Sequence, residues 1–130
     1  DKLGYDLVIV DKKREKANES QVMNIIGDVK GKDVILVDDM VDTAGTLVKA
    51  AEVLKEKGAN SVMACCTHGV LSGPAYERVA NGVLDELVIS DTIPTKKNAK
   101  KITVLTASSI IGEAIRRIHN NESVNSIFNS

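Results

Sequence analysis

The segment Asp33-Val34-Ile35-Leu36-Val37-Asp38-Asp39-Met40-Val41-Asp42-Thr43-Ala44-Gly45-Thr46 decides how the rest of this 130-residue chain is interpreted. It opens with four consecutive apolar residues, 34–37, which are typical of a strand buried on both faces of a parallel sheet. Two carboxylates, Asp38 and Asp39, follow where that strand is predicted to end. A small-residue loop at 42–46 then leads into a predicted helix whose apolar face consists of Leu47, Ala50, Ala51 and Leu54.

This order of strand, acidic pair, loop and helix suits a sugar phosphate. Unpaired N–H groups and the positive dipole at the helix N-terminus attract phosphate, and the small residues Ala44 and Gly45 let it approach the backbone. The two loop threonines add hydroxyl donors, and the acidic pair can accept hydrogen bonds from vicinal ribose hydroxyls. Two adjacent acids alone are more often a structural turn, but the attached loop favours a binding site.

The composition predicts one domain with an aliphatic core, because 43% of the residues are AVILMFWYC and only one Phe, two Tyr and no Trp are present. A net charge of -1 indicates neither a nucleic-acid partner nor an anionic membrane surface. No apolar run approaches the ~20 residues of a membrane span, and none has the pattern of a signal peptide. Cys65 and Cys66 are adjacent in a predicted strand and point to opposite faces, so we expect reduced thiols in a cytoplasmic protein.

Strands and helices alternate along the chain. Besides 34–37, strands are predicted at 7–10, 22–26, 62–66, 87–89 and 102–105, and loops at 15–20 and 67–69. The pattern predicts an α/β fold with a mostly parallel sheet flanked by helices on both faces, a three-layer αβα arrangement. Ligands of such sheets bind beyond the carboxyl ends of the strands, where Asp38 and the 42–46 loop are expected.

Three helices are predicted, each from its start and stop signals. The first follows the 42–46 loop and ends before Gly58, a typical C-terminal glycine. The second is capped by Ser72 and has Pro74 in its first turn. The third is capped by Ser108 or Ser109 and carries Ile111, Ile115 and Ile118 on one side, with a polar tail at 120–130.

The segment 38–46 resembles the ribose-5-phosphate signature shared by phosphoribosyltransferases and ribose-phosphate pyrophosphokinases (PRPP synthases). Further segments resemble the pyrophosphokinase family and run in its order: Asp11-Lys12-Lys13-Arg14, Ile26-Gly27-Asp28-Val29, Thr67-His68-Gly69, Ser72-Gly73-Pro74-Ala75, Asp91-Thr92-Ile93-Pro94 and Ser123-Val124 to Phe128. The resemblance covers nearly the whole chain but only the C-terminal part of that enzyme. It implies a type I phosphoribosyltransferase-like fold.

The resemblance implies a transferase that moves diphosphate from ATP to the C1 hydroxyl of ribose 5-phosphate, giving PRPP and AMP for nucleotide biosynthesis. Residues 1–130 would form a single phosphoribosyltransferase-like domain, the C-terminal half of the family enzyme, with the N-terminal half absent. We expect this domain to hold the ribose-5-phosphate site and part of the catalytic loop, and to be inactive alone. A Mg²⁺ cofactor is implied, with its principal ligands in the missing half and no metal ligand assigned here. Partners would be ribose 5-phosphate, ATP and further copies of the chain, since the family forms hexamers.

The resemblance also implies roles for individual residues. Lys12 would be the catalytic lysine and Arg14 a substrate contact, although without the family the two would be interpreted as a solvated charge run. They are two residues apart in an extended segment and point to the same side, so they could clamp phosphates. Lys13 replaces a common Arg, and Ala44 stands where the family often has Gly. The implied ribose-5-phosphate ligands, besides Arg14, are Asp38, Asp39, Asp42, Thr43, Ala44, Gly45 and Thr46.

The end of the chain is the least specific part of the resemblance. Ser123 and Phe128 match a family segment that helps bind a regulatory nucleotide and phosphate at a subunit interface, but Asn125 replaces a usual Ser. Docking of Phe128 on a neighbouring surface is an equal alternative. We expect a structural hydrogen bond for His68 and assign no role to His119. A phosphoribosyltransferase and a non-catalytic regulatory subunit remain the alternative functions.

Overall fold

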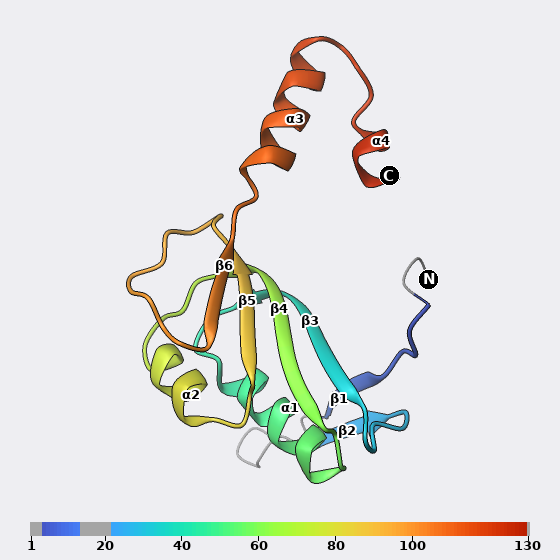
Figure 1. The fold of residues 1–130 in the computed structure, drawn as a ribbon, viewed down its shortest axis with the longest axis vertical. Coiled ribbons are helices and arrows are strands. Elements are labelled where there is room, and N and C mark those ends of the chain that lie inside the picture. The colour runs from blue at the N-terminus through green and yellow to red at the C-terminus, as the bar shows by residue number, and fades with distance from the viewer. Residues whose placement is uncertain (1–3, 14–21, 130) are drawn as a thin grey trace.

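The computed structural model describes residues 4–13 and 22–129. The body of the molecule is a four-stranded parallel sheet in the order β3-β4-β5-β6 (Figure 1). Its strands are β3 Asp33–Val41, β4 Ser61–Gly69, β5 Glu86–Ser90 and β6 Ile102–Leu105. The helices between them are α1 Gly45–Glu56 and α2 Ala75–Asn81. The predicted α/β fold with a parallel sheet flanked by helices is confirmed.

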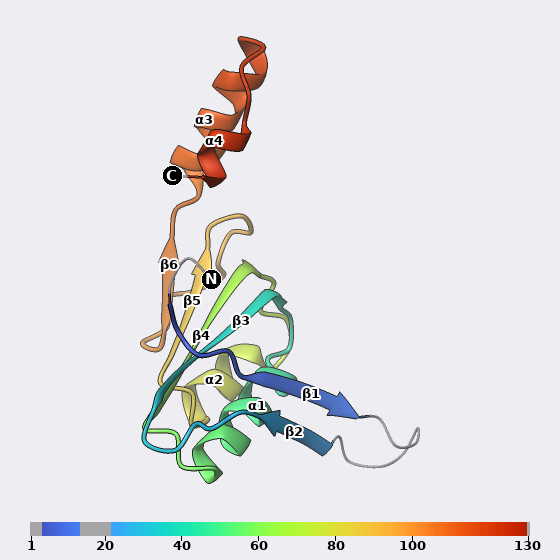
Figure 2. The same ribbon diagram turned by 90° about the vertical axis from the view of Figure 1, so that its right-hand side faces the viewer.

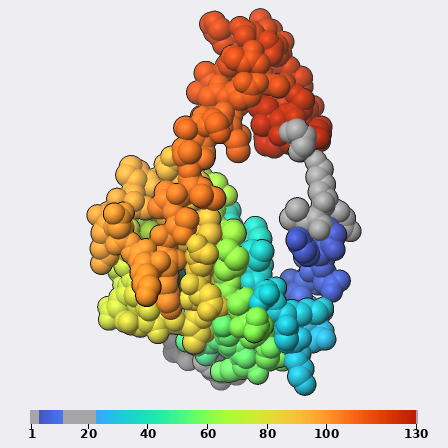
Figure 3. All heavy atoms as spheres, in the orientation of Figure 1, coloured from blue at the N-terminus to red at the C-terminus, as the bar shows by residue number. Residues whose placement is uncertain are grey.

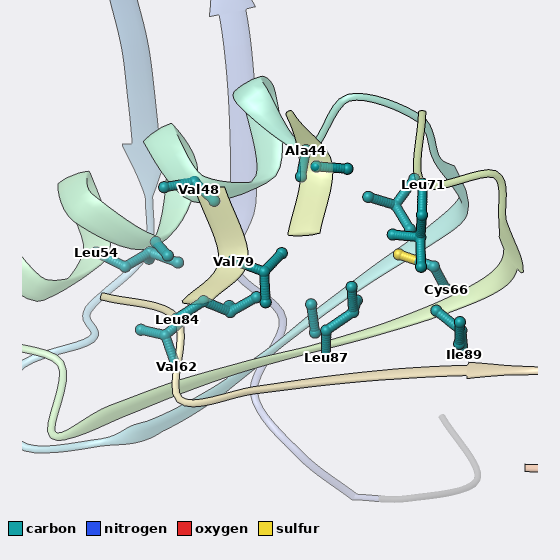
Figure 4. Close-up of a cluster of buried hydrophobic side chains, with 14 of the residues drawn as sticks. Ala44, Val48, Leu54, Val62, Cys66, Leu71, Val79, Leu84, Leu87 and Ile89 are labelled. Atoms are coloured by element: carbon teal, nitrogen blue, oxygen red, sulfur yellow. The ribbon is translucent and has the colours of Figure 1, made fainter. Parts of the chain in front are cut away.

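The core fills the space between this sheet and the two helices (Figure 4). Its most deeply buried side chains are aliphatic, as the composition predicts, and comprise Leu54, Val62, Val79, Leu84, Leu87 and Ile89. They come from α1, α2, the strands and the segment before β5, so the core ties the strand ends to the helices. The predicted end of α1 is confirmed, because Gly58 follows the helix with a φ of +94°.

Both α1 and α2 lie on the same face of the sheet (Figure 2). The chain moves from β3 to β4 to β5 in one direction, and right-handed crossovers in one direction place their helices on one face. The opposite face therefore carries no helix within the described part of the chain, and Ile35 and Val37 of β3 are 56% and 80% exposed there. The expected second helical layer is not contributed by these residues.

The first two strands do not join the parallel sheet. β1 Ile9–Lys13 and β2 Val22–Ile26 form an antiparallel pair of their own, with Ile9 opposite Ile26. The strand predicted at 22–26 is confirmed, whereas the first begins two residues later than predicted. Parallel neighbours need a crossover of about a dozen residues or more, and the connection between these strands is shorter. The loop predicted at 15–20 lies outside the described residues.

The last two helices form a C-terminal arm, residues 108–128, that projects beyond the sheet (Figures 1 and 3). It contains α3 Ser108–His119 and α4 Asn125–Phe128, a short helix in the segment predicted to be a polar tail. The predicted face of Ile111, Ile115 and Ile118 exists, but these side chains are exposed in the arm instead of packing on the sheet. No helix among the described residues is long and apolar enough to cross a membrane.

Ion pairs hold the arm together. Glu113 accepts hydrogen bonds from Arg116 at 2.9 Å and from Arg117 at 2.7 Å. These bonds to the two guanidinium groups lower the pKa of Glu113 to about 2. Arg117 also donates to the backbone oxygen of Ser123 at 2.9 Å, which ties the segment leading to α4 back to α3.

Candidate functional site

The acidic pair lies within β3, not after it. β3 and β4 continue to pair past the apolar residues, with Asp38 opposite Cys66 and Met40 opposite His68. The prediction that Thr67-His68-Gly69 forms a loop is therefore wrong, since these residues end β4. Strand pairing uses backbone groups, so polar side chains do not stop it. The extension carries Asp38 and Asp39 to the carboxyl end of the sheet.

A cavity of about 240 Å³ lies at this end of β3. It is lined by the consecutive residues 38–47, so it brings together the acidic pair and the whole small-residue loop expected to bind ribose 5-phosphate. The backbone N–H of Asp39 donates to a carboxylate oxygen of Asp38 at 2.9 Å. The structure thus places seven of the expected ligands around one cavity, and their roles in binding stay predictions.

The loop enters α1 through a left-handed residue. Ala44 has φ +61° and ψ 6° and precedes the first helical residue, Gly45. No side chain caps α1, and its first turn holds no acidic residue. The N–H groups and the positive dipole of this helix end are therefore available to an anion in the cavity.

Two side chains from distant parts of the sequence hold this loop. The hydroxyl of Ser72 donates to the Asp42 carboxylate, and the backbone N–H of Ser72 donates to the backbone oxygen of Asp42 at 3.0 Å. Arg78 of α2 donates from Nη1 to the backbone oxygen of Thr43 at 3.1 Å. The predicted cap role of Ser72 is wrong, because α2 has no side-chain cap and Pro74 occupies its N-cap position. The sequence offered no signal for the Arg78 contact.

Polar contacts also fix the neighbouring strand ends. His68 makes the expected structural hydrogen bond, between Nδ1 and the hydroxyl of Thr92 at 2.8 Å. Asp91 accepts from the backbone N–H of Ala107 at 2.8 Å, a bond that lowers the pKa of Asp91. This contact holds the start of α3, and the cap predicted at Ser108 or Ser109 is wrong, because α3 has no side-chain cap.

The two cysteines are free, as predicted from their alternating orientation. Cys66 is buried while Cys65 is only half-buried. Burial, together with the nearby charges of Asp38 and Asp39, raises the pKa of the Cys66 thiol to about 11. A thiol held neutral in this way is a core side chain and a poor nucleophile.

The other expected residues lie away from the cavity or outside the description. Lys12 belongs to β1, with its backbone opposite Met23, while its side chain and Arg14 lie outside the described residues. Ser123 and Phe128 belong to the C-terminal arm, and His119 is the last residue of α3. Across residues 4–13 and 22–129, no three His, Cys, Asp or Glu side chains are grouped so as to hold a metal ion.

The sheet, the acidic pair and the small-residue loop at an open helix N-terminus define a phosphoribosyltransferase-like α/β domain. The family model of the phosphoribosyl synthetase-associated domain matches residues 8–129, and the chain belongs to this family.

Similar proteins extend this result. The chain is 71% identical over 126 residues to the ribose-phosphate pyrophosphokinase of Campylobacter jejuni subsp. jejuni, a match that covers 97% of this chain and 41% of that protein. It is 67% identical over 128 residues to the ribose-phosphate pyrophosphokinase of Wolinella succinogenes, covering 98% and 41%. The crystal structure of phosphoribosylpyrophosphate synthetase from Mycobacterium smegmatis matches with a TM-score of 0.74 and 41% identity, covering 77% of this chain and 34% of that one. The chain thus spans about two fifths of the length of these curated relatives.

Proposed function

We propose that this chain carries the ribose-5-phosphate site of a ribose-phosphate diphosphokinase, which transfers diphosphate from ATP to the C1 hydroxyl of ribose 5-phosphate and yields PRPP and AMP. The relatives named ribose-phosphate pyrophosphokinase support this activity. The observation that carries the proposal is the cavity lined by residues 38–47, in which two carboxylates lie beside an uncapped helix N-terminus. A sugar with vicinal hydroxyls at one end and a phosphate at the other matches this pair of features.

The residues of the cavity would divide the ligand between them. Asp38 and Asp39 accept hydrogen bonds from the ribose hydroxyls, while the backbone N–H groups of residues 43–46 and the threonine hydroxyls hold the 5-phosphate. Lys12 acts as the catalytic lysine, stabilising negative charge as the diphosphate moves. Arg14 contributes a second substrate contact. Positioning and electrostatics account for the catalysis proposed here.

The chain would form one phosphoribosyltransferase-like domain, corresponding to the C-terminal half of the relatives. The described residues offer no group of three His, Cys, Asp or Glu side chains for a metal ion. The family resemblance places the principal Mg²⁺ ligands and the ATP-binding elements in the other half. The chain by itself would then bind ribose 5-phosphate without making PRPP.

The C-terminal arm supports self-association. Its isoleucine face and Phe128 are exposed, and covering such a face is favourable for a second copy of the chain. A regulatory role for Ser123 and Phe128 at that contact would follow the family resemblance. The two free cysteines support a cytoplasmic location.

Thermal melts of the purified chain test the binding site. Ribose 5-phosphate should raise the melting temperature, since a ligand at 100 times its Kd adds about 2.7 kcal/mol to the free energy of unfolding. Ribose, which lacks the phosphate, and 2-deoxyribose 5-phosphate, which lacks a hydroxyl, should each stabilise less at the same concentration. Equal shifts with all three sugars, or none with ribose 5-phosphate, would refute the site.

The same preparation tests completeness. Incubation with ATP, Mg²⁺ and ribose 5-phosphate should give no PRPP, and appreciable synthesis would show that the chain needs no other half. Consumption of PRPP with a nucleobase acceptor would instead support a phosphoribosyltransferase.

A further inference from the structure

The guanidinium of Arg78 lies against the first residue of α1. A Cβ built on Gly45 would be 3.0 Å from Nη1 of Arg78 and 3.6 Å from its Cζ. The same Nη1 donates to the backbone oxygen of Thr43 at 3.1 Å. Because Gly45 has no side chain, the guanidinium of Arg78 can lie beside the N-terminus of α1 and the small-residue loop at 42–46.

The contact with Thr43 orients the next peptide N–H. A trans peptide is planar, with its C=O and N–H pointing in opposite directions, and the chain has no cis peptide among its described residues. The bond that turns the Thr43 oxygen toward Arg78 thus turns the N–H of Ala44 away from it. Ala44 is also left-handed, a conformation that surrounding contacts must maintain in a residue other than glycine.

The positive charge of Arg78 lies close to a group of three negatively charged carboxylates. Asp38, Asp39 and Asp42 line the cavity, and α1 has no charged residue in its first turn that would attract an anion. Arg78 is exposed, and its side-chain hydrogen bond within the described part of the chain uses one of five guanidinium N–H donors. The remaining donors and the full positive charge stay available beside the loop.

We infer that Arg78 is a positioning residue for the 5-phosphate: it holds the Thr43–Ala44 peptide in its binding orientation and supplies the positive charge that offsets the three carboxylates. This inference rests on the proposed function. The sequence motif 38–46 does not include Arg78, which belongs to α2 and lies 35 residues after Thr43 in the chain.

Calorimetric titration of the purified 130-residue chain with ribose 5-phosphate and with ribose tests the inference. Arg78→Gln should weaken ribose 5-phosphate binding by about 10-fold or more, the effect of losing a charge-assisted contact, while leaving the affinity for ribose unchanged. Arg78→Lys, which restores the charge without the planar fork, should recover part of the loss. Raising the salt concentration should weaken the wild type more than Arg78→Gln. Arg116→Gln, which removes an equivalent charge from the C-terminal arm, should bind like wild type.

Gly45→Ala provides a second test that keeps the arginine. Its Cβ would displace the guanidinium, so it should weaken ribose 5-phosphate binding, and adding Arg78→Gln to it should cause little further loss. If Arg78→Gln fails to fold, Arg78→Met, which keeps most of the aliphatic stem without the charge, takes its place in the titrations.

The outcomes separate this inference from the proposed function. Binding of ribose 5-phosphate by wild type and by Arg78→Gln with equal affinity would refute the role of Arg78 and leave the function standing. Equal weakening for ribose and ribose 5-phosphate would reduce Arg78 to a structural brace and also refute the inference. Wild-type affinity in Gly45→Ala would show that the contact is irrelevant. A wild type that binds neither sugar would overturn both.

Discussion

Replacing Gly69 by alanine should destabilise the chain because the end of β4 packs directly on a fully buried side chain. A Cβ at Gly69 would be 2.5 Å from Cδ1 of Ile89 and 3.3 Å from both its Cβ and its Cγ2. Ile89 is only 1% exposed, so its Cδ1 can move only by displacing other atoms of the packed core. Forcing an extra methyl into a packed core costs about 1–3 kcal/mol, and this substitution should lower the free energy of unfolding by that amount.

The clash can be assigned to a single methyl group. Ile89→Val removes the Cδ1 atom and leaves only the 3.3 Å contacts, at a cost of about 0.5–1.5 kcal/mol when made alone. The double variant should therefore be more stable than the sum of the two losses predicts, by at least about 1 kcal/mol.

Urea unfolding followed by circular dichroism on the purified chain measures all three variants. Gly112→Ala is the matched control, because a Cβ at Gly112 of α3 meets nothing within 4 Å. It should leave the free energy of unfolding unchanged or raise it by up to about 1 kcal/mol, since alanine favours a helix. A Gly69→Ala variant as stable as wild type, or strict additivity in the double variant, would refute the packing argument.

Ala44→Gly should change the free energy of unfolding by no more than about 1 kcal/mol, because relief of the strained left-handed backbone offsets the loss of a buried methyl group. Ala51→Gly, in the middle of α1, should lower the free energy of unfolding by about 2 kcal/mol. Equal losses for the two variants in urea unfolding would contradict this. Glu113 has its pKa lowered from 4.5 to about 2, so its contribution is complete above pH 4.5 and disappears as the pH falls toward 2. Amide signals of the folded C-terminal arm should therefore shift as the pH falls toward about 2, and Glu113→Gln should remove the shift. A variant that titrates like wild type would exclude this carboxylate. In a longer protein that carries this domain, Lys12→Ala should lower kcat on the order of 100-fold or more with little change in the KM for ribose 5-phosphate. A raised KM at unchanged kcat would make Lys12 a ground-state contact.

The parts of the fold that local signals encode were predictable. The strand at 22–26 and the end of α1 before Gly58 follow from an apolar run and a left-handed glycine, and both are confirmed. The sequence did not predict how far β3 and β4 extend. Met40 pairs with His68 through backbone hydrogen bonds between the two strands, and the identity of neither side chain indicates this pairing.

The candidate site shows the same division. The residues that line its cavity, 38–47, are consecutive, and the seven of them that are expected to bind the ligand all belong to one motif. The residues that support the loop are distant in sequence, because β4 and α2 bring Ser72 and Arg78 to it. Ser72, two residues before Pro74, also has the sequence pattern of a helix cap. The isoleucine face of α3 illustrates a further limit of sequence patterns. A helix that packs on its own sheet and a helix that projects from it can have the same amphipathic pattern.

β3 is an edge strand, whose neighbour in the described sheet is β4 alone. In open α/β sheets the ligand crevice forms at a topological switch point, where the strand order reverses and loops leave two adjacent strands in opposite directions. The order β3-β4-β5-β6 contains no reversal, so in a complete sheet the acidic pair and its loop would form one wall of such a crevice. Further parallel strands beside the free edge of β3, each one farther from β4 than the last, would reverse the strand order at β3 and create such a switch point. Right-handed crossovers would then place their helices over Ile35 and Val37, and their loops would supply the second wall.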